Sequence, residues 1–285
     1  MRARTPRRPF HLLLAVPALV LAFGSAHAQT SQTVTPPAST EVKPYEPTVG
    51  QPGKDVIWVP TAQALVDHML RMAEIKPDDY LIDLGSGDGR TVITAAQRGI
   101  RAHGIEYNPK MVKLSQEAAQ KAGVTDKATF VEGDIFESDF SKATVLTLFL
   151  LPDINLRLRP LILDMKPGTR VVSNSFDMGE WTPDDSVDNA AECRTYCRAF
   201  KWIVPAKVEG NWELSNKAQL HLTQSFQMLK GHFTQNGTQH DISDAKMTGT
   251  KIAFTANGKK YTGEVADNKI TGSDGQGNTW SATRK

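Results

Sequence analysis

The segment DLGSGDGR, from Asp83 to Arg90, combines acidic side chains with a glycine-rich turn. Gly85, Gly87 and Gly89 allow the backbone to pass close beneath a ligand and to turn into the N-terminus of a helix. A dinucleotide-binding turn reads G-x-G-x-x-G, and here Arg90 occupies the position of its third glycine. The pattern therefore predicts a nucleotide-like ligand other than NAD.

Asp88 lies inside this turn, where its carboxylate would repel a pyrophosphate. The same carboxylate tolerates a ligand that carries an ammonium and a sulfonium. S-adenosylmethionine is such a ligand, and its own carboxylate can meet the free amides of the helix N-terminus. The charge pattern thus favours S-adenosylmethionine as the cofactor.

Two further acids stand where a nucleoside needs acceptors. Glu106 follows Asp83 by 23 residues, and an acid about 20 residues beyond a glycine-rich loop can accept both ribose hydroxyls. Asp134 can accept from the adenine amine, with Ile135 against the ring. Either acid alone reads equally well as a solvated residue at a strand end. Three acids at the ends of three consecutive strands favour a binding site for S-adenosylmethionine.

Apolar periodicity provides the elements that must position these residues. The predicted helices are 62–73, with Thr61 as N-cap, 89–98, 109–122 and 154–165; the predicted strands are 80–84, 102–106, 128–131, 144–151 and 170–174. This alternation predicts an α/β fold, a Rossmann-like, mostly parallel sheet with helices on both faces. Ligands of such sheets bind at the carboxyl ends of the strands. We expect 199–214 to add an antiparallel edge.

The composition changes at about residue 218, where helical periodicity ends and short strands alternate with glycine-containing turns. This pattern predicts a small all-β meander domain. We therefore divide the chain into a cofactor-binding domain at 56–215 and a β-meander domain at 216–285.

The N-terminal residues have the features of a targeting segment. An arginine-rich start, an apolar stretch and Ala26-His27-Ala28 predict a signal peptide at 1–28, although an uncleaved anchor is the alternative. Arg7 and Arg8 partly match a twin-arginine signal. Residues 29–55, rich in Pro, Thr and Ser, read as a linker or as an arm over the domain. We expect a periplasmic or secreted protein without a membrane span after cleavage.

Charge and cysteine content narrow the partners. Of 33 lysines and arginines, four lie in 1–28, so 29 remain against 31 acids. A nearly neutral chain predicts no nucleic-acid partner. Cys193 and Cys197, four residues apart, fit either a disulfide across a tight turn or two free thiols. No second ligand pair accompanies them, which predicts no metal site.

Residues 58–184 resemble the seven-strand class I methyltransferases, and within these the protein-lysine methyltransferases of mitochondria and archaea. Besides DLGSGDGR, the resemblance rests on VPT at 59–61, GIEYNP at 104–109 and WTPD at 181–184. It implies a methyltransferase in which Thr61 lies near the methionine end of the cofactor, while Glu106 and Asp134 hold ribose and adenine.

The loop after the fourth strand, LLPDIN at 150–155, lacks the Asp/Asn-Pro-Pro-Tyr sequence of amide and base-amine methyltransferases. Leu151, Asp153, Asn155 and Trp181 are the candidate substrate contacts. Asp153 and Asn155 are equally well explained as helix N-cap residues, and Trp181 as a cover for the sheet edge.

These observations predict an exported S-adenosylmethionine-dependent methyltransferase that acts on a lysine of an envelope protein. A small-molecule or lipid acceptor is the alternative, with the β domain shaping the acceptor site. A third hypothesis is a cofactor-binding scaffold without turnover, which the intact acids disfavour.

Overall fold

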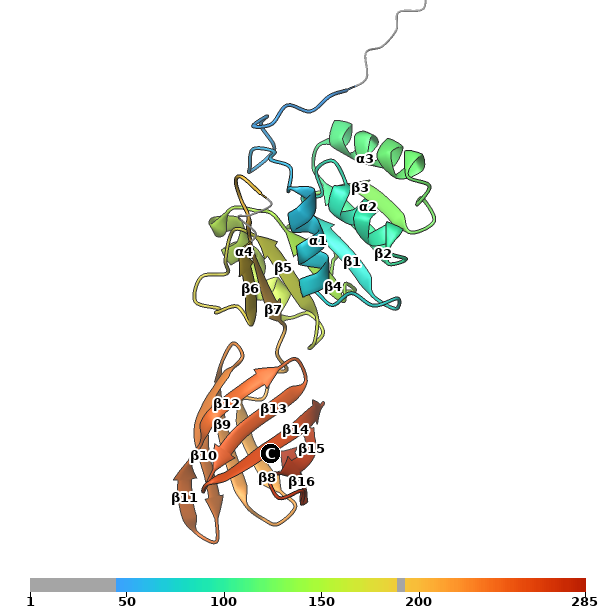
Figure 1. Cartoon of the computed structure of the whole chain (residues 1–285). Coiled ribbons are helices and arrows are strands. Elements are labelled where there is room, and N and C mark those ends of the chain that lie inside the picture. Colours follow the sequence, from blue (N-terminus) through green and yellow to red (C-terminus); the bar gives the residue numbers. More distant parts are fainter. Residues whose placement is uncertain (1–44, 189–192) are drawn as a thin grey trace, which may run out of the picture. The chain divides into compact units, whose positions relative to one another are not determined.

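A mixed β-sheet organises the first part of the described chain. The computed structural model describes residues 45–188 and 193–285, all within the unit 44–285 (Figure 1). The predicted signal peptide at 1–28 and most of the predicted linker at 29–55 lie outside the described residues. None of the described helices is long and apolar enough to span a membrane.

The sheet has the strand order β3-β2-β1-β4-β5-β7-β6 among the described residues. Its strands are β1 (Tyr80–Leu84), β2 (Arg101–Glu106), β3 (Ala128–Glu132), β4 (Val145–Leu148), β5 (Arg170–Asn174), β6 (Asp185–Asp188) and β7 (Arg198–Ile203). Strands β1 to β5 are parallel, whereas β7 runs antiparallel to β5 and β6 runs antiparallel to β7. The order reverses between β1 and β4, the place where ligands of such sheets bind.

Helices cover the two faces of this sheet. They are α1 (Gln63–Met72), α2 (Arg90–Gln97), α3 (Pro109–Lys121) and α4 (Pro152–Leu163) (Figure 1). Apolar residues of α1, α2 and α3 share one buried cluster with the sheet, and those of α4 belong to the cluster on the other face. The predicted Rossmann-like, mostly parallel sheet is therefore present.

The start of α1 differs from the prediction. Ala62, not Thr61, is the N-cap residue, and it makes no side-chain capping bond. The Thr61 hydroxyl instead accepts a hydrogen bond of 3.1 Å from Asn174 Nδ2 at the end of β5. The threonine therefore ties the start of α1 to the carboxyl edge of the sheet.

A buried ion pair joins the start of β1 to β5. Asp79 accepts hydrogen bonds from the Arg170 guanidinium, from Thr144 Oγ1 at 2.7 Å and from the Lys76 amide at 2.7 Å. Asp79 is only 5% exposed. Burial raises the pKa of this carboxyl, but the three hydrogen bonds outweigh burial and hold the pKa below its ordinary value.

The C-terminal strands form a closed antiparallel barrel rather than the predicted meander. They are β8 (Gly210–Leu214), β9 (Gln219–Ser225), β10 (Met228–Gln235), β11 (Thr238–Asp241), β12 (Ser243–Thr248), β13 (Lys251–Ala256), β14 (Lys259–Ala266), β15 (Lys269–Asp274) and β16 (Thr279–Arg284). The pairing of β9 with β10 closes the sheet, so strands distant in sequence meet. Closure removes the edges that an open meander would leave.

The start of the barrel also differs from the predicted boundary at residue 216. Strand β8, expected at the edge of the first sheet, pairs with β9 and β16. Trp212, Ala206 and Val208 belong to the barrel core. The second domain therefore begins near Ala206, because the apolar residues of β8 need the barrel to cover them.

Candidate cofactor-binding site

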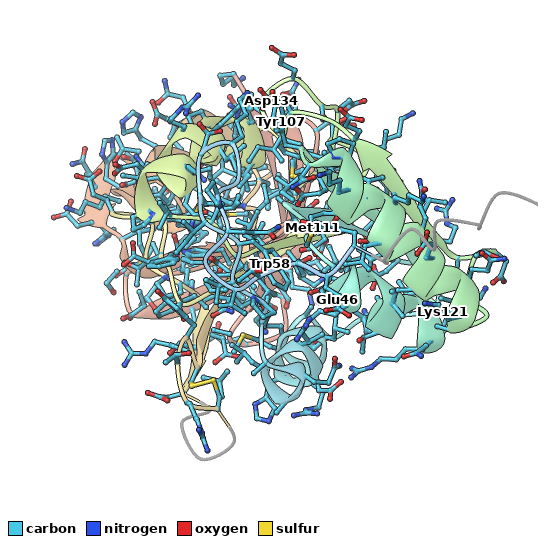
Figure 2. All side chains as sticks on the ribbon, turned by 90° about the horizontal axis from the view of Figure 1, so that it is seen from above. Glu46, Trp58, Tyr107, Met111, Lys121 and Asp134 are labelled. Atoms are coloured by element: carbon cyan, nitrogen blue, oxygen red, sulfur yellow. A yellow bond between two sulfur atoms is a disulfide. The ribbon has the colours of Figure 1, made fainter. Side chains whose placement is uncertain are left out.

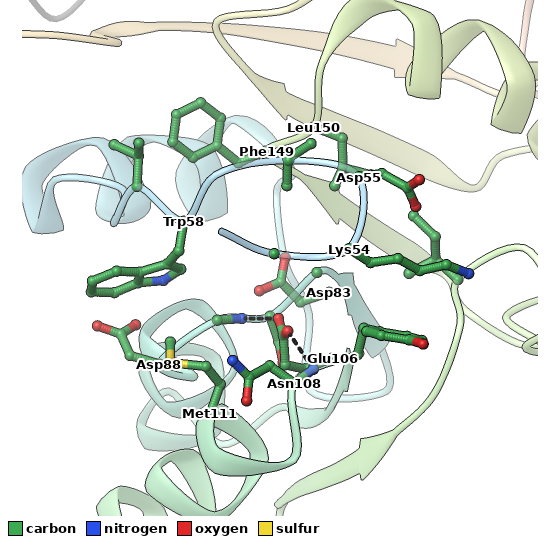
Figure 3. A pocket seen from close by; sticks show the side chains of 18 of the residues that line it. Lys54, Asp55, Trp58, Asp83, Asp88, Glu106, Asn108, Met111, Phe149 and Leu150 are labelled. Carbon is green, nitrogen blue, oxygen red and sulfur yellow. Dashed lines mark hydrogen bonds between the residues drawn. The ribbon is translucent and has the colours of Figure 1, made fainter. Parts of the chain in front are cut away.

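A pocket lies at the carboxyl ends of β1 and β4, where the strand order reverses (Figure 3). Seven of the eight residues predicted to bind the cofactor line it: Thr61, Asp83, Gly85, Gly87, Glu106, Asp134 and Ile135. Gly89, the eighth, does not. Residues from far apart in the sequence thus converge because five parallel strands end at one edge.

The glycine turn of 85–89 needs its glycines for two different reasons. Gly87 has a φ of 54°, and a Cβ there would lie 2.6 Å from Trp58 Nε1. Gly89, with a φ of 80°, is the N-cap of α2, and a Cβ there would lie 2.8 Å from Phe130 and Ser115. Gly87 therefore keeps the pocket floor open, whereas Gly89 lets α2 pack closely on β3.

Asp83 lies at the base of the pocket and is 7% exposed. Its Oδ1 accepts a hydrogen bond of 2.6 Å from the Thr147 hydroxyl. Burial raises the pKa of this carboxyl to about 7; the Thr147 bond opposes the rise, and the nearby charges of Asp88 and Glu106 add to it. Such a site favours a ligand that brings positive charge.

Glu106 ends β2 with both carboxylate oxygens on the floor of the pocket (Figure 3). Oε2 accepts from the Gly87 amide and Oε1 from the Asn108 amide, each at 2.9 Å. A carboxylate has about four acceptor sites, so each oxygen keeps a lone pair for a ligand hydroxyl. The fixed orientation suits a pair of vicinal hydroxyls such as those of ribose.

Asp134 lies on the far side of the pocket beside Ile135. Its Oδ1 accepts from the Phe136 amide at 2.9 Å, and its Oδ2 pairs with the Lys54 ammonium. The hydrogen bond from Lys54, followed by that from the Phe136 amide, holds the pKa of Asp134 below its ordinary value. The carboxylate is therefore ionised and keeps acceptor capacity for an amine.

Asp88 is not free in the loop as the sequence argument assumed. Arg90 Nη2 lies 2.5 Å from Asp88 Oδ2, and Arg90 Nε lies 3.0 Å from both carboxylate oxygens. Arg90 Nη1 also donates to the Thr61 carbonyl at 2.8 Å. Arg90 thus joins the glycine loop to the start of α1, and it partly neutralises the acid.

The part of the predicted linker that the structure describes runs over the pocket, which fits the arm rather than a plain tether. Residues 51–61 line the pocket from above. Lys54 lies 4.9 Å from the centroid of the Tyr107 ring. Trp58 lies over Gly87, close to Met111 (Figures 2 and 3). The arm covers the two ends of the pocket with a cation and an indole.

The four candidate substrate contacts do not line this pocket. Leu151 is 44% exposed and is the N-cap residue of α4, so neither Asp153 nor Asn155 caps that helix. Asn155 is fully buried, and its Nδ2 donates to the carbonyls of Phe176 at 3.3 Å and Asp177 at 3.1 Å.

Trp181 is likewise fully buried and does not reach the pocket. Its ring centroid lies 6.0 Å from that of Trp202, whose Nε1 donates to the Trp181 carbonyl at 2.6 Å. Burial of this kind agrees with the alternative that Trp181 covers the sheet edge.

Sequence reasoning missed several residues of the pocket wall. Lys54, Trp58, Asn108, Met111 and Phe149 all line it. Phe149 had a usable signal, since it directly follows an apolar strand at the edge where ligands bind. Lys54 had none, because its pairing with Asp134 spans 80 positions.

The residues present fit S-adenosylmethionine. A Cβ at Gly85 or Gly87 would enter the space bounded by Leu150 and Trp58, so the loop forms a cradle that side chains would fill. The buried acid of Asp83 suits an ammonium, and Glu106 suits a ribose. Within the described residues, no cluster of His, Cys, Asp and Glu has the arrangement of a metal site.

Comparison with known proteins agrees with this assignment. Residues 83–185 match the family model of the ANTKMT methyltransferase domain. A protein-lysine N-methyltransferase of Saccharolobus islandicus (strain REY15A) is 43% identical over 135 residues, which cover 46% of this chain and 84% of the relative.

Two mouse proteins show the same relationship over a smaller share of their length. A lysine N-methyltransferase of Mus musculus that is named for a component of the ATP synthase is 36% identical over 128 residues, covering 45% of this chain and 51% of the relative. The adenine nucleotide translocase lysine N-methyltransferase of the same organism is 32% identical over 130 residues, covering 45% and 56%. The chain thus spans about half the length of these mouse relatives.

Among solved structures, an RNA methyltransferase from Salinibacter ruber in complex with S-adenosyl-L-homocysteine is 46% identical. It covers 53% of this chain and 96% of that chain, with a TM-score of 0.49.

Proposed function

Because the chain belongs to the family of class I protein-lysine N-methyltransferases, we propose that it methylates the ε-amine of a lysine in a protein. It is an S-adenosylmethionine-dependent methyltransferase. The observation that carries the proposal is the acidic pocket at the carboxyl edge of β1, β2 and β4, in which Asp83, Glu106 and Asp134 face one space.

The pocket residues divide the cofactor between them. Glu106 would hold the ribose hydroxyls, Asp134 and Ile135 the adenine, and Asp83 the ammonium of the methionine part. When bound, S-adenosylmethionine supplies a methyl group made electrophilic by its sulfonium. The chain needs little acid–base chemistry of its own, because it must mainly align an acceptor and deliver it unprotonated.

An apolar approach serves that delivery. A lysine amine has an unperturbed pKa of about 10.4, so most of it is protonated at neutral pH. Burial against apolar groups disfavours the charged form and lowers the pKa. Phe149 and Leu150, which follow β4 and line the pocket, supply such surroundings.

We further propose that the protein is exported and that its target is an envelope protein. Support comes from the arginine-rich, apolar start at 1–28 and its Ala26-His27-Ala28 sequence. Replacement of Arg7 and Arg8 by lysine should hold the precursor inside the cell if the twin-arginine route is used. Normal export of that variant would indicate the general secretory route instead.

The substrate class is tested with the chain from Gln29, methyl-labelled S-adenosylmethionine and an envelope extract. Label should enter lysine side chains of protein, located by mass spectrometry, and should be absent with a Glu106→Ala variant. Label confined to lipid, to a small molecule or to RNA would contradict the proposal.

A further inference from the structure

Three aromatic rings gather next to the cofactor pocket. The ring centroids of Phe149 and Phe176 are 6.2 Å apart, those of Phe149 and Tyr196 are 5.2 Å apart, and those of Phe176 and Tyr196 are 6.0 Å apart. Each spacing lies in the range of attractive ring contacts, about 4.5–7 Å. The three rings therefore form one cluster, called here the ring cluster.

The sheet topology explains why these rings meet. Phe149 follows β4 and Phe176 follows β5, and the two strands are parallel, so both residues lie at the carboxyl edge. Tyr196 precedes β7, which runs antiparallel to β5, and its start therefore reaches the same edge. The Ser175 amide donates to the Arg198 carbonyl at 2.8 Å and joins the two segments.

Polar and covalent contacts hold two of the rings in place. Asn155 Nδ2 donates to the Phe176 carbonyl at 3.3 Å, which fixes the turn after β5. Tyr196 lies within the short loop closed by the disulfide between Cys193 and Cys197, the yellow bond in Figure 2. Burial alone does not explain this arrangement, because Tyr196 remains 43% exposed.

The ring cluster extends from the pocket to the surface. Phe149 lines the cofactor pocket, while Phe176 and Tyr196 lie outside it. An acceptor that reaches the cofactor along this path passes three aromatic faces. Such faces suit a long aliphatic stem that ends in a cation.

We propose that the ring cluster receives the side chain of the acceptor lysine and that Tyr196 is a specificity-determining residue for it. The proposal rests on the proposed function and names its acceptor subsite. The aliphatic stem packs against the rings, and the ammonium is attracted to the ring face as it enters. The methylated product keeps its positive charge and therefore the same attraction.

Steady-state kinetics tests this role on the lysine-containing protein identified by the labelling experiment. Tyr196→Ala should raise the acceptor KM about fivefold to thirtyfold, the change expected for the loss of one cation–π contact. Tyr196→Phe, which keeps the ring, should stay close to the wild type. The affinity for S-adenosylhomocysteine, measured by calorimetry, should be unchanged in both variants.

Arg194→Ala provides the matched control, because Arg194 is an exposed residue of the same disulfide loop. It should leave the acceptor KM unchanged. A similar rise in KM for Arg194→Ala and Tyr196→Ala would indicate a general disturbance of the loop and would overturn the assignment.

A binding measurement gives a readout that does not depend on turnover. The probes are Nα-acetyl-Nε-trimethyllysine amide and its neutral analogue, in which carbon replaces the charged nitrogen. Saturation-transfer NMR with protein saturated by S-adenosylhomocysteine should favour the charged probe. Tyr196→Ala should abolish this preference, and Arg194→Ala should retain it. Equal signals from the two probes with the wild type would overturn the cation-binding role.

The two proposals fail in different ways. If no lysine acquires label, the proposed function is wrong, and the acceptor subsite fails with it. If a lysine is labelled and Tyr196→Ala leaves both the acceptor KM and the probe preference unchanged, only the subsite is wrong.

Discussion

The Thr147 hydroxyl donates a hydrogen bond of 2.6 Å to the Asp83 carboxylate across β4 and β1, where the two residues are register partners. Both side chains are buried. Burial raises the pKa of Asp83 to about 7 despite this bond, and the charges of Asp88 and Glu106 contribute to the rise. Near neutral pH the carboxyl therefore holds a proton for part of the time.

Cofactor binding should release this proton. An ammonium placed beside Asp83 favours the ionised carboxyl and lowers its pKa, so protons leave when S-adenosylhomocysteine binds at about pH 6.5–7. Calorimetry in two buffers of different ionisation enthalpy should detect a fractional release that declines above about pH 8. Asp83→Asn should abolish it, whereas Asp153→Asn, outside the pocket, should not. Equal release by Asp83→Asn and the wild type would place the titrating group elsewhere.

Glu106→Gln should weaken cofactor binding more than its small change in shape suggests. The amide replaces one acceptor oxygen by a donor, and that donor would face the amide of Gly87 or Asn108. Loss of a hydrogen bond to a charged group is worth about 1.5–3 kcal/mol, or about tenfold to 150-fold in affinity. Calorimetry with S-adenosylhomocysteine measures the loss.

The control for this variant is Glu132→Gln, since Glu132 is the exposed register partner of Glu106 on β3. It should bind with wild-type affinity. A weakening by Glu132→Gln that equals that of Glu106→Gln would point to the stability of the β2–β3 edge rather than to the ribose contact.

The sequence predicted the pocket residues best where the chemistry is local. Gly87 and Glu106 belong to short motifs at strand ends, and parallel strands bring such ends together whatever the details of packing. Predictions for Asn155 and Trp181 named the right segments, but periodicity could not tell which side chains turn inward. Asn155 is buried because two backbone carbonyls of the turn after β5 need its amide.

Contacts between distant segments were beyond prediction. Lys54 reaches Asp134 from a stretch with the composition of a linker. The closure of the barrel depends on the pairing of β9 with β10, although the local turns of an open meander would look the same. Strand β8 was assigned to the wrong sheet because one apolar alternation fits either edge.

Trp58 should report cofactor binding through its fluorescence. It is the only one of the five tryptophans of the chain that lines the pocket, and the others are buried elsewhere in the described residues. S-adenosylhomocysteine should change the emission of the wild type in a saturable manner. Trp58→Phe should lose the signal but retain binding by calorimetry. A full signal in Trp58→Phe would mean that the arm does not contact the ligand.

The ion pair of Asp79 and Arg170 should make stability depend on pH in the acidic range. The pKa of Asp79 is lower in the folded protein, so its contribution is complete above the ordinary value of 3.8 and is lost as the pH falls through the folded pKa. Asp79→Asn should lower the free energy of unfolding at pH 7 by about 3–5 kcal/mol, as expected when one partner of a buried pair is removed.

Chemical denaturation at pH 7 and at pH 3 measures this difference, which should shrink at the lower pH. Asp67→Asn is the matched control, because the ion pair of Asp67 with Arg98 is partly exposed. Its cost should be about 0–1 kcal/mol. A difference between Asp79→Asn and the wild type that does not depend on pH would contradict the assignment of the shift to Asp79.

The disulfide between Cys193 and Cys197 should set the acceptor KM through Tyr196. Tyr196 has a φ of 56°, a left-handed conformation that costs a residue other than glycine roughly 1–2 kcal/mol. The closed loop holds this conformation, so opening it should lower the fraction of molecules with the ring in the cluster. Reduction by dithiothreitol, or Cys193→Ser with Cys197→Ser, should raise the acceptor KM about fivefold to thirtyfold. Affinity for S-adenosylhomocysteine should not change, and the double variant should no longer respond to dithiothreitol. A double variant with the KM of the oxidised wild type would show that the loop positions Tyr196 without its covalent bridge.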